Sequence, residues 1–200
     1  MSVKQQKKNV NTILAAVFVI VFICAISIYA YTILVQKGET DTETPSPIPA
    51  EVLLTVHVNS EVYNYTLDDL LAFDNVTEQG SYVNRIGRVS GPYMYTGVPM
   101  TVFLDTIPSL PTNYTVHAVA SDGYTLNYTP DEVNGYIMTY NETGAEIGLG
   151  NFTMLIAYQE DGVFLNETTR GPLRIVFVDS EPSITFSGLW LSSLFSLEIL

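Results

Sequence analysis

The sequence predicts a strand-dominated α+β domain outside a membrane, preceded by one transmembrane helix. Three observations lead to this prediction. A long uncharged apolar run lies near the N-terminus, many short segments beyond residue 50 are rich in β-branched and aromatic residues, and Gly, Asn and Asp clusters separate these segments. Short strands bounded by such turn residues, with two or three small helices among them, are typical of an α+β fold.

The apolar run extends from Ile13 to Val35, and its 23 residues include no charged side chain. A helix of this length spans roughly 35 Å, which exceeds a hydrocarbon core of about 30 Å. A cleavable signal peptide is the alternative, but its apolar region is typically about 7–15 residues long and ends at a small-residue cleavage site. Residues 27–30 match such a site poorly. We therefore expect an uncleaved transmembrane helix over residues 13–35.

Lysines predict the orientation of this helix. Lys4, Lys7 and Lys8 precede it and only Lys37 follows closely, so residues 1–12 are expected in the cytoplasm. Residues 36–50 are rich in Thr and Pro and form an extended linker. The remaining residues, 51–200, are expected to form an extracellular domain of a single-pass cell-membrane protein, whose first partner is the lipid bilayer.

Seven N-x-T sequons lie beyond the apolar run and none precedes it, which favours the same orientation and indicates a glycosylated surface protein. Their asparagines are Asn64, Asn75, Asn113, Asn127, Asn141, Asn151 and Asn166.

Charge and cysteine content exclude several functions. From Glu51 onward there are 18 Asp and Glu, four Arg and no Lys, so the net charge is 4 − 18 = −14. Nucleic acids are excluded as partners, because their recognition needs a basic surface that displaces phosphate counterions. The only cysteine, Cys24, lies inside the predicted membrane helix. The external domain therefore has no disulfide and no thiolate, and its stability must come from its core.

The first half of the domain has clear local signals. Residues 52–58 and 61–66 are predicted as a β-hairpin around a two-residue turn. Thr66 to Asp69 has the pattern of a capping box, so a short helix should follow. Residues 75–84 have strand character toward their end. Residues 87–104 contain three glycines and two prolines, and we expect a loop that passes into a second short helix from Met100.

The second half repeats short strands and turns. Strands are expected over residues 114–120, 124–128, 136–140, 152–158 and 173–178, with one helical turn over 130–133. The chain closes with residues 189–200, where Phe195, Leu197 and Ile199 alternate as a last strand.

Most motifs for metal or hydrolytic chemistry are missing. The domain has two histidines, His57 and His117, each within a strand pattern, and no H-E-x-x-H spacing. Its acidic pairs do not have the spacing of a calcium-binding loop, and there is no G-x-S-x-G motif around a serine nucleophile. We therefore assign no catalytic residue and no metal ligand.

Four arginines remain as candidates. Arg85 and Arg88 flank the predicted loop, and Arg170 and Arg174 bracket Gly171-Pro172-Leu173. Converging guanidinium groups bind phosphate and other anions through paired N–H donors. The alternative is that each arginine pairs with one of the many carboxylates, and the sequence leaves both open.

An ordered series of motifs resembles the molybdopterin-binding oxidoreductase domain of the sulfite oxidase family. The series consists of V-S-G-P-Y-M-Y-T-G-V-P-M-T-V-F-L-D at 89–105, A-S-D-G-Y at 120–124, residues 155–162, R-G-P-L-R-I-V-F at 170–177 and Trp190-Leu191. The resemblance covers residues 52–200 and implies a mixed fold around a pterin pocket. By position it implies that cofactor-binding residues are Tyr82, Arg85, Arg88, Tyr95, His117, Asp122, Tyr124, Arg170 and Arg174.

The resemblance also implies a molybdenum-ligating cysteine shortly before the Y-T-G-V-P element, and residues 82–95 contain none. Because a thiolate is the bond between such a protein and its metal, ordinary molybdenum catalysis is not expected. The leading prediction is a ligand- or partner-binding module that takes a small anionic ligand or an envelope protein. The alternatives are an active molybdopterin-dependent oxidoreductase subunit and a structural cell-envelope glycoprotein. A pocket lined by Tyr82, Arg85, Tyr95 and Asp122 would favour ligand binding.

Overall fold

The computed structural model describes residues 50–108, 110, 111 and 113–200. These residues fold around two β-sheets, which confirms the strand-dominated α+β prediction. The predicted cytoplasmic segment (1–12), transmembrane helix (13–35) and nearly all of the linker (36–50) lie outside the described residues. Among the residues that are described, no helix is long and apolar enough to cross a membrane.

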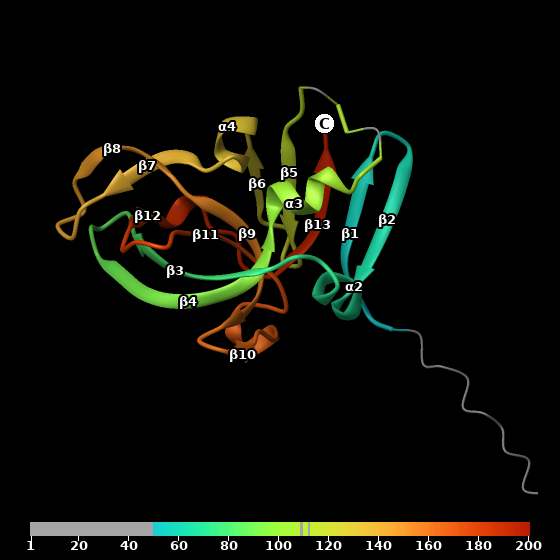
Figure 1. The fold of residues 1–200 in the computed structure, drawn as a ribbon, viewed down its shortest axis with the longest axis horizontal. Helices are drawn as coiled ribbons and strands as arrows, with labels where there is room; N and C mark the ends of the chain where they lie inside the picture. Colours follow the sequence, from blue (N-terminus) through green and yellow to red (C-terminus); the bar gives the residue numbers. More distant parts are fainter. Residues whose placement is uncertain (1–49, 109, 112) are drawn as a thin grey trace, which may run out of the picture. The chain divides into compact units, whose positions relative to one another are not determined.

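The first sheet has five strands in the order β2-β1-β13-β5-β6. Its strands are β1 (Val52–Val58), β2 (Glu61–Thr66), β5 (Val116–Ala120), β6 (Thr125–Tyr128) and β13 (Leu194–Ile199). The hairpin of β1 and β2 is confirmed, and the C-terminal strand β13 inserts between β1 and β5, parallel to β1. In Figure 1 β2 forms the outer edge of this sheet on the right.

The second sheet has eight strands in the order β10-β9-β4-β3-β12-β7-β8, with β11 paired to β9. Its strands are β3 (Val76–Val83), β4 (Val89–Pro99), β7 (Tyr136–Tyr140), β8 (Glu146–Asn151), β9 (Thr153–Glu160), β10 (Val163–Phe164), β11 (Arg174–Val178) and β12 (Ile184–Phe186). Figure 1 shows β8 at one outer end of this sheet, and β10 at the lower side of the domain.

Short helices connect the strands. They are α2 (Leu67–Leu71), α3 (Met100–Asp105), α4 (Pro130–Val133) and the 3₁₀ turns η1 (Glu167–Thr169) and η2 (Ser187–Leu189). The predicted capping box is confirmed, because the Asp69 backbone N–H donates to Thr66 Oγ1 at 3.2 Å and the Thr66 N–H donates to Asp69 Oδ2 at 2.8 Å. Thr129 and Glu132 form the same motif at the start of α4.

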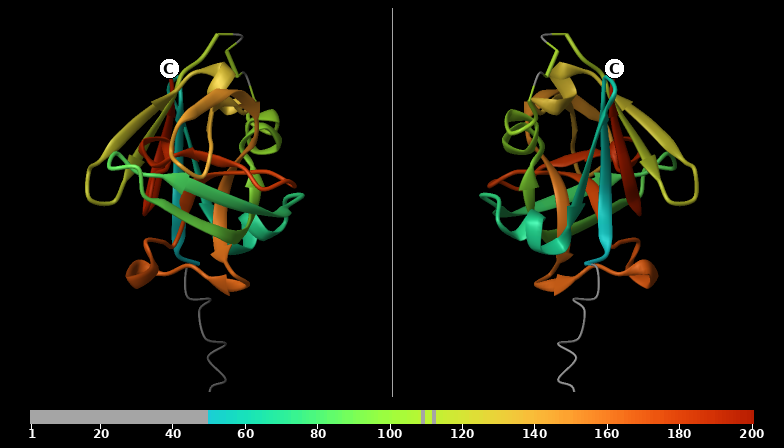
Figure 2. Two further views of the ribbon diagram at one scale, coloured as in Figure 1. Left: turned by 90° about the vertical axis from the view of Figure 1, so that its left-hand side faces the viewer. Right: turned by 90° about the vertical axis from the view of Figure 1, so that its right-hand side faces the viewer.

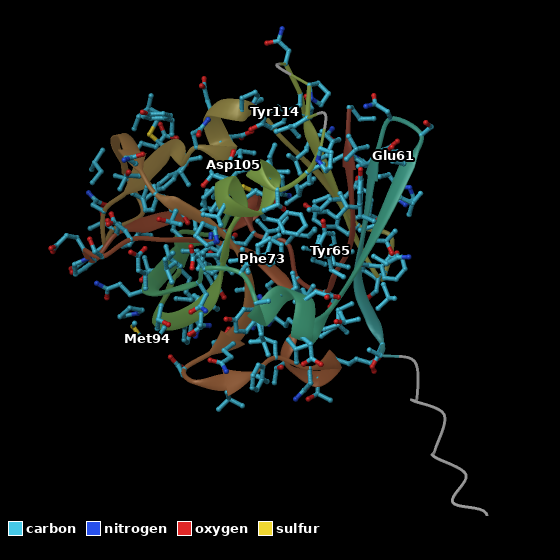
Figure 3. All side chains as sticks on the ribbon, turned by 45° about the vertical axis from the view of Figure 1, so that its right-hand side comes forward. Glu61, Tyr65, Phe73, Met94, Asp105 and Tyr114 are labelled. Atoms are coloured by element: carbon cyan, nitrogen blue, oxygen red, sulfur yellow. The ribbon has the colours of Figure 1, made fainter. Side chains whose placement is uncertain are left out.

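One core cluster draws on both sheets, and strands β9 and β11 are buried over most of their length. An aromatic cluster of Tyr65, Phe73 and Phe103 joins the first sheet to the helices, with ring centroids of Tyr65 and Phe103 4.9 Å apart. Figure 3 shows Tyr65 and Phe73 on neighbouring elements. Burial of such large rings supplies much of the stability of a domain without disulfides.

Residues 87–104 do not form the predicted loop. Most of them form β4, an eleven-residue strand that pairs with β3 and β9. Gly97 is required by close packing rather than by a turn, because a Cβ there would lie 2.3 Å from the carbonyl oxygen of Ile156. Strands β8, β10 and β12 were not predicted from the sequence.

The predicted last strand is confirmed as β13, but its burial does not alternate regularly at Phe195. Leu197 and Ile199 are buried as expected, but Phe195 is exposed and Leu194 is buried instead. The register of β13 against β5 shifts between Leu194 and Ser196. Such a β-bulge moves one side chain to the opposite face, so simple alternation fails at this point.

Candidate functional site

The four arginines have different environments, and Arg174 is the one that forms an ion pair within the described residues. Arg174 is the first residue of β11, opposite Ala157 of β9, and its side chain points into the protein with 2% exposure. Its Nη1 lies 2.5 Å from Glu160 Oε2 and donates to Tyr95 Oη at 3.3 Å. The sequence left open whether each arginine binds an anion or pairs with an acidic side chain. For Arg174, the structure shows pairing with an acidic side chain.

Aromatic rings surround the Arg174 guanidinium. Its Cζ lies 5.4 Å from the ring centroid of Tyr95 and 5.9 Å from that of Trp190, within cation–π range. Tyr95 and Trp190 also pack edge to face, with centroids 5.5 Å apart. The Trp190 indole N–H donates to Thr185 Oγ1 at 2.8 Å, which holds the ring in place. These contacts leave the buried guanidinium with no face open to a ligand, and its role is to hold the core together.

Burial raises the pKa of the Tyr95 hydroxyl well above its usual value, and Glu160 acts in the same direction while the positive charge of Arg174 opposes it. Tyr95 is therefore neutral over the physiological range. The Nε atom of Arg174 is buried without a hydrogen-bond partner in the described part of the chain.

Tyr82 and Arg170 form the solvent-facing end of this cluster. Tyr82, on β3, packs edge to face on Trp190 with centroids 4.9 Å apart and is partly exposed. Arg170 follows η1 in the left-handed conformation (φ 66°), and its Nη1 donates to Tyr82 Oη at 3.5 Å. We call Tyr82 and Arg170 the Tyr–Arg pair. Unlike Arg174, Arg170 has an exposed side chain and no carboxylate within salt-bridge distance among the described residues.

The electrostatics of Tyr82 reflect two nearby positive charges. Burial acts to raise its pKa, but hydrogen bonds from Arg170 and Ser90 and the charges of Arg170 and Arg174 outweigh it, so the pKa is lowered. The hydrogen bond to Tyr82 in turn raises the pKa of Arg170. The lowered pKa of Tyr82 therefore reflects positive potential from the two arginines at its hydroxyl.

Arg85 and Arg88 lie apart from the Tyr–Arg pair. Both belong to the exposed turn between β3 and β4, where Asn84 Oδ1 accepts hydrogen bonds from the backbone N–H groups of Ile86 and Arg88. Among the described contacts, only those of Arg170 and Arg174 reach the cluster of Tyr82, Tyr95 and Trp190. The resemblance placed all four arginines at one site, and for Arg85 and Arg88 that assignment stays a prediction.

The remaining predicted residues belong to the five-stranded sheet. His117 on β5 lies 2.6 Å from Asn127 Oδ1 through its Nδ1, and Asp122 Oδ1 accepts the backbone N–H of Tyr124 in the β5–β6 turn. These are local contacts of strand and turn residues. Tyr82, Arg85, Tyr95 and Asp122 do not line one pocket, because Tyr95 is fully buried and Asp122 lies in the β5–β6 turn of the other sheet.

The backbone nevertheless joins the β5–β6 turn to the turn that carries Arg170. The Ser121 N–H donates to the Ser193 carbonyl at 2.9 Å, and the Ser193 N–H donates to the Arg170 carbonyl at 2.7 Å. Beside these turns is a cavity of about 500 Å³ that Ser121, Ser193 and Gly171 help to line, together with Glu51 and Glu167. This cavity carries negative charge and does not include the Tyr–Arg pair.

Glu160 and Trp190 were not predicted as site residues, although they complete the cluster. A buried arginine needs a carboxylate partner, so the isolated arginine in a strand-like apolar run at 173–178 was a signal for such a residue. Nothing in the sequence identifies Glu160 among the 18 acidic residues. Its position depends on the antiparallel register of β9 and β11.

The described residues do not fit a molybdenum cofactor. They include no cysteine, and they contain no group of three or more His, Cys, Asp or Glu placed to hold a metal ion. Arg174 already has its carboxylate partner.

Comparison with known proteins shows a distant fold relation. The sulfane dehydrogenase SoxCD from Paracoccus pantotrophus matches with a TM-score of 0.53 and 16% sequence identity, over 73% of this chain and 37% of that chain. At this identity the likeness shows the fold alone, and the present chain spans well under half the length of its neighbour. No protein-family model matches the sequence, and no curated protein matches it.

Proposed function

We propose that this protein is a membrane-anchored module whose external domain binds a small oxyanion-bearing ligand at the Tyr–Arg pair, without molybdenum catalysis. The observation that carries the proposal is the state of Arg170. In a domain with 18 acidic residues and four arginines, its guanidinium is exposed, is not neutralised by a carboxylate and points to a tyrosine hydroxyl.

The chemistry of the Tyr–Arg pair suits a sulfate, phosphate or carboxylate group. The guanidinium has further N–H donors besides the one directed to Tyr82, and it can bind two oxygens of one anion in a planar fork. The Tyr82 hydroxyl adds a neutral donor. Behind the pair, Arg174 adds positive potential, and Glu160 partly offsets it.

The resemblance in motif order and the fold shared with SoxCD support descent from a molybdopterin-type domain. The absence of a thiolate from residues 51–200 supports loss of the metal chemistry. The placement of the domain outside the cell membrane is part of the proposal. It is supported by the 23-residue apolar run and by the lysines that precede it.

Trp190 provides a direct test, because it is the only tryptophan of the chain and its ring packs against Tyr82. Sulfate titrated into the full-length protein in detergent should change the Trp190 fluorescence with saturation. Arg170→Gln should weaken the response by roughly tenfold or more, since it removes charge-assisted hydrogen bonds.

Arg88→Gln is the matched control, because Arg88 is equally charged and exposed but lies in a different turn. This variant should bind sulfate as the wild type does. A fluorescence response that is absent, or that Arg170→Gln leaves unchanged, would refute the anion site.

A further inference from the structure

The open edges of both sheets share an unexpected feature. The five-stranded sheet ends at β2 and β6, and the eight-stranded sheet ends at β8 and, beyond β9, at the short strand β10. Strand β11 also pairs with β9, but it is fully buried and is not an open edge. An edge strand exposes unpaired backbone N–H and C=O groups, which can pair with another chain and cause aggregation. In both views of Figure 2 the orange segment that contains β10 and η1 projects from one end of the domain.

Sequons lie at each of these four edges. Asn64 is in β2, Asn127 is in β6, Asn151 is the last residue of β8, and Asn166 lies two residues after β10. The other three sequons, at Asn75, Asn113 and Asn141, lie in connecting segments. Within the described residues, therefore, no sequon asparagine lies on an interior strand of either sheet.

The edge strands also have no lysine side chains to hinder pairing with another chain. Lysine is the residue that most often protects an edge strand from pairing, and the domain contains none. Large apolar side chains are exposed on the edge strands, including Leu149 of β8 at 74% and Val163 of β10 at 66%. Val62 of β2 is 55% exposed. These exposed apolar side chains on lysine-free edges favour association with another chain.

We infer that the protein carries N-linked glycans at Asn64, Asn127, Asn151 and Asn166, and that these glycans shield the open edges of its two sheets. The inference rests on the extracytoplasmic placement given under the proposed function, and it is independent of the Tyr–Arg pair. A glycan beside an edge strand excludes a second chain by its bulk and hydration.

The four asparagines are available for this modification. All four side chains are exposed. Where they form hydrogen bonds, they use Oδ1 as the acceptor: Asn64 accepts from Thr55 Oγ1 at 3.1 Å, and Asn166 accepts from Thr168 Oγ1 at 2.6 Å. The Nδ2 atom therefore remains free to react. In the transfer, Nδ2 forms a bond to the sugar C1, the amide loses one proton, and a lipid diphosphate leaves C1 of its oligosaccharide.

Some sequon residues also cap helices, so the test must separate the loss of a glycan from the loss of a cap. Thr66 and Thr129 are the N-caps of α2 and α4, and Asn166 is the N-cap of η1. Asn64→Gln and Asn127→Gln remove the sequons and leave both threonine caps intact. Asn166→Asp keeps the Oδ1 acceptor and removes the glycosylation site. Asn151→Gln completes a quadruple variant.

The first measurement is made on the full-length protein purified from its own organism. Chymotrypsin suits the tyrosine-rich, lysine-free domain, and mass spectrometry of the peptides should show a glycan mass on each of the four asparagines. Unmodified peptides at these four positions would overturn the inference. Sulfate binding, measured by Trp190 fluorescence on the same sample, does not depend on whether the glycans are present. Absence of glycans would therefore refute this inference and leave the proposed ligand site untouched.

The second measurement tests the shielding. The quadruple variant, produced in the same organism, should form oligomers or aggregates in sedimentation velocity at concentrations where the wild type is monodisperse. The control is the double variant Asn75→Gln/Asn113→Gln, which removes sequons away from the four edges and should stay monodisperse. A quadruple variant as monodisperse as this control would overturn the shielding role.

Discussion

Arg170 and Arg174 are four residues apart, yet they have opposite roles in this domain. Arg174 is buried, paired with Glu160 and enclosed by two aromatic rings. Arg170 is exposed, lacks a carboxylate partner in the described chain and reaches the hydroxyl of Tyr82. One short segment thus places one arginine in the core and the other at the surface, because Gly171-Pro172 lies between them. We propose that the exposed arginine binds the ligand and that the buried one supports the site.

The largest expected effect is on stability when the buried arginine is replaced. Arg174→Met would leave Glu160 and the Tyr95 hydroxyl without their partner. Breaking a buried ion pair typically costs about 3–5 kcal/mol, and the partial exposure of Glu160 (31%) places the expected loss near the lower end. The free energy of unfolding from urea denaturation is the measurement. A loss below about 1 kcal/mol would show that Arg174 is not a core anchor.

The next effect is a pH dependence from Tyr95. Its folded-state pKa is raised, chiefly by burial, so its contribution to stability is complete below the unfolded value of about 10 and is lost as pH rises through the folded pKa. The unfolding free energy of the wild type should therefore fall above about pH 10. Tyr95→Phe, which cannot ionise, should show a shallower fall, and equal slopes would contradict the role given to Tyr95.

Tyr82 should contribute to the pH dependence of the unfolding free energy with the opposite sign. Because Arg170 and Arg174 lower its folded-state pKa, Tyr82 adds stability above its unfolded pKa, and that addition is lost as pH falls through the folded value. Arg170→Gln should raise the Tyr82 pKa. Titration of ring-labelled tyrosine followed by NMR would measure the change, with Arg88→Gln as the control that leaves it unaltered. If the Tyr82 pKa were the same in Arg170→Gln as in the wild type, the proposed interaction between Tyr82 and Arg170 would be refuted.

The smallest effect is expected on stability when an exposed arginine is replaced. Arg170→Gln and Arg88→Gln should each change the free energy of unfolding by less than about 0.5 kcal/mol, as is usual for exposed positions. Thermal unfolding of the two variants beside Arg174→Met would check this. If Arg170→Gln destabilised the domain as strongly as Arg174→Met, the distinction between supporting and binding arginines would fail.

Local signals predicted much of the fold. The β1–β2 hairpin and the capping box at Thr66 depend on neighbouring residues, and both are confirmed. Features that depend on distant contacts were not predictable. The glycines of β4 look like turn residues, but Gly97 is needed because β9 passes close to it. The face of Phe195 depends on a bulge that pairing with β5 imposes.

The candidate site, like the fold, was predicted only in part. Tyr82, Tyr95, Arg170 and Arg174 were identified from the order of motifs, and they lie together. Glu160 could not be selected from the sequence, because only the register of β9 against β11 brings it to Arg174. Arg85, Arg88, His117, Asp122 and Tyr124 were assigned to the same site by motif order alone, and the structure places them in other turns and strands.

The most direct test of the central claim is to locate a bound oxyanion. Crystals of the protein grown with selenate, an analogue of sulfate, would show the selenium by its anomalous scattering. We predict a peak within hydrogen-bond distance of both the Arg170 guanidinium and Tyr82 Oη, and loss of that peak in Arg170→Gln. Selenate bound only beside Arg85 and Arg88, or at no described arginine, would contradict the assignment of the Tyr–Arg pair as the binding site.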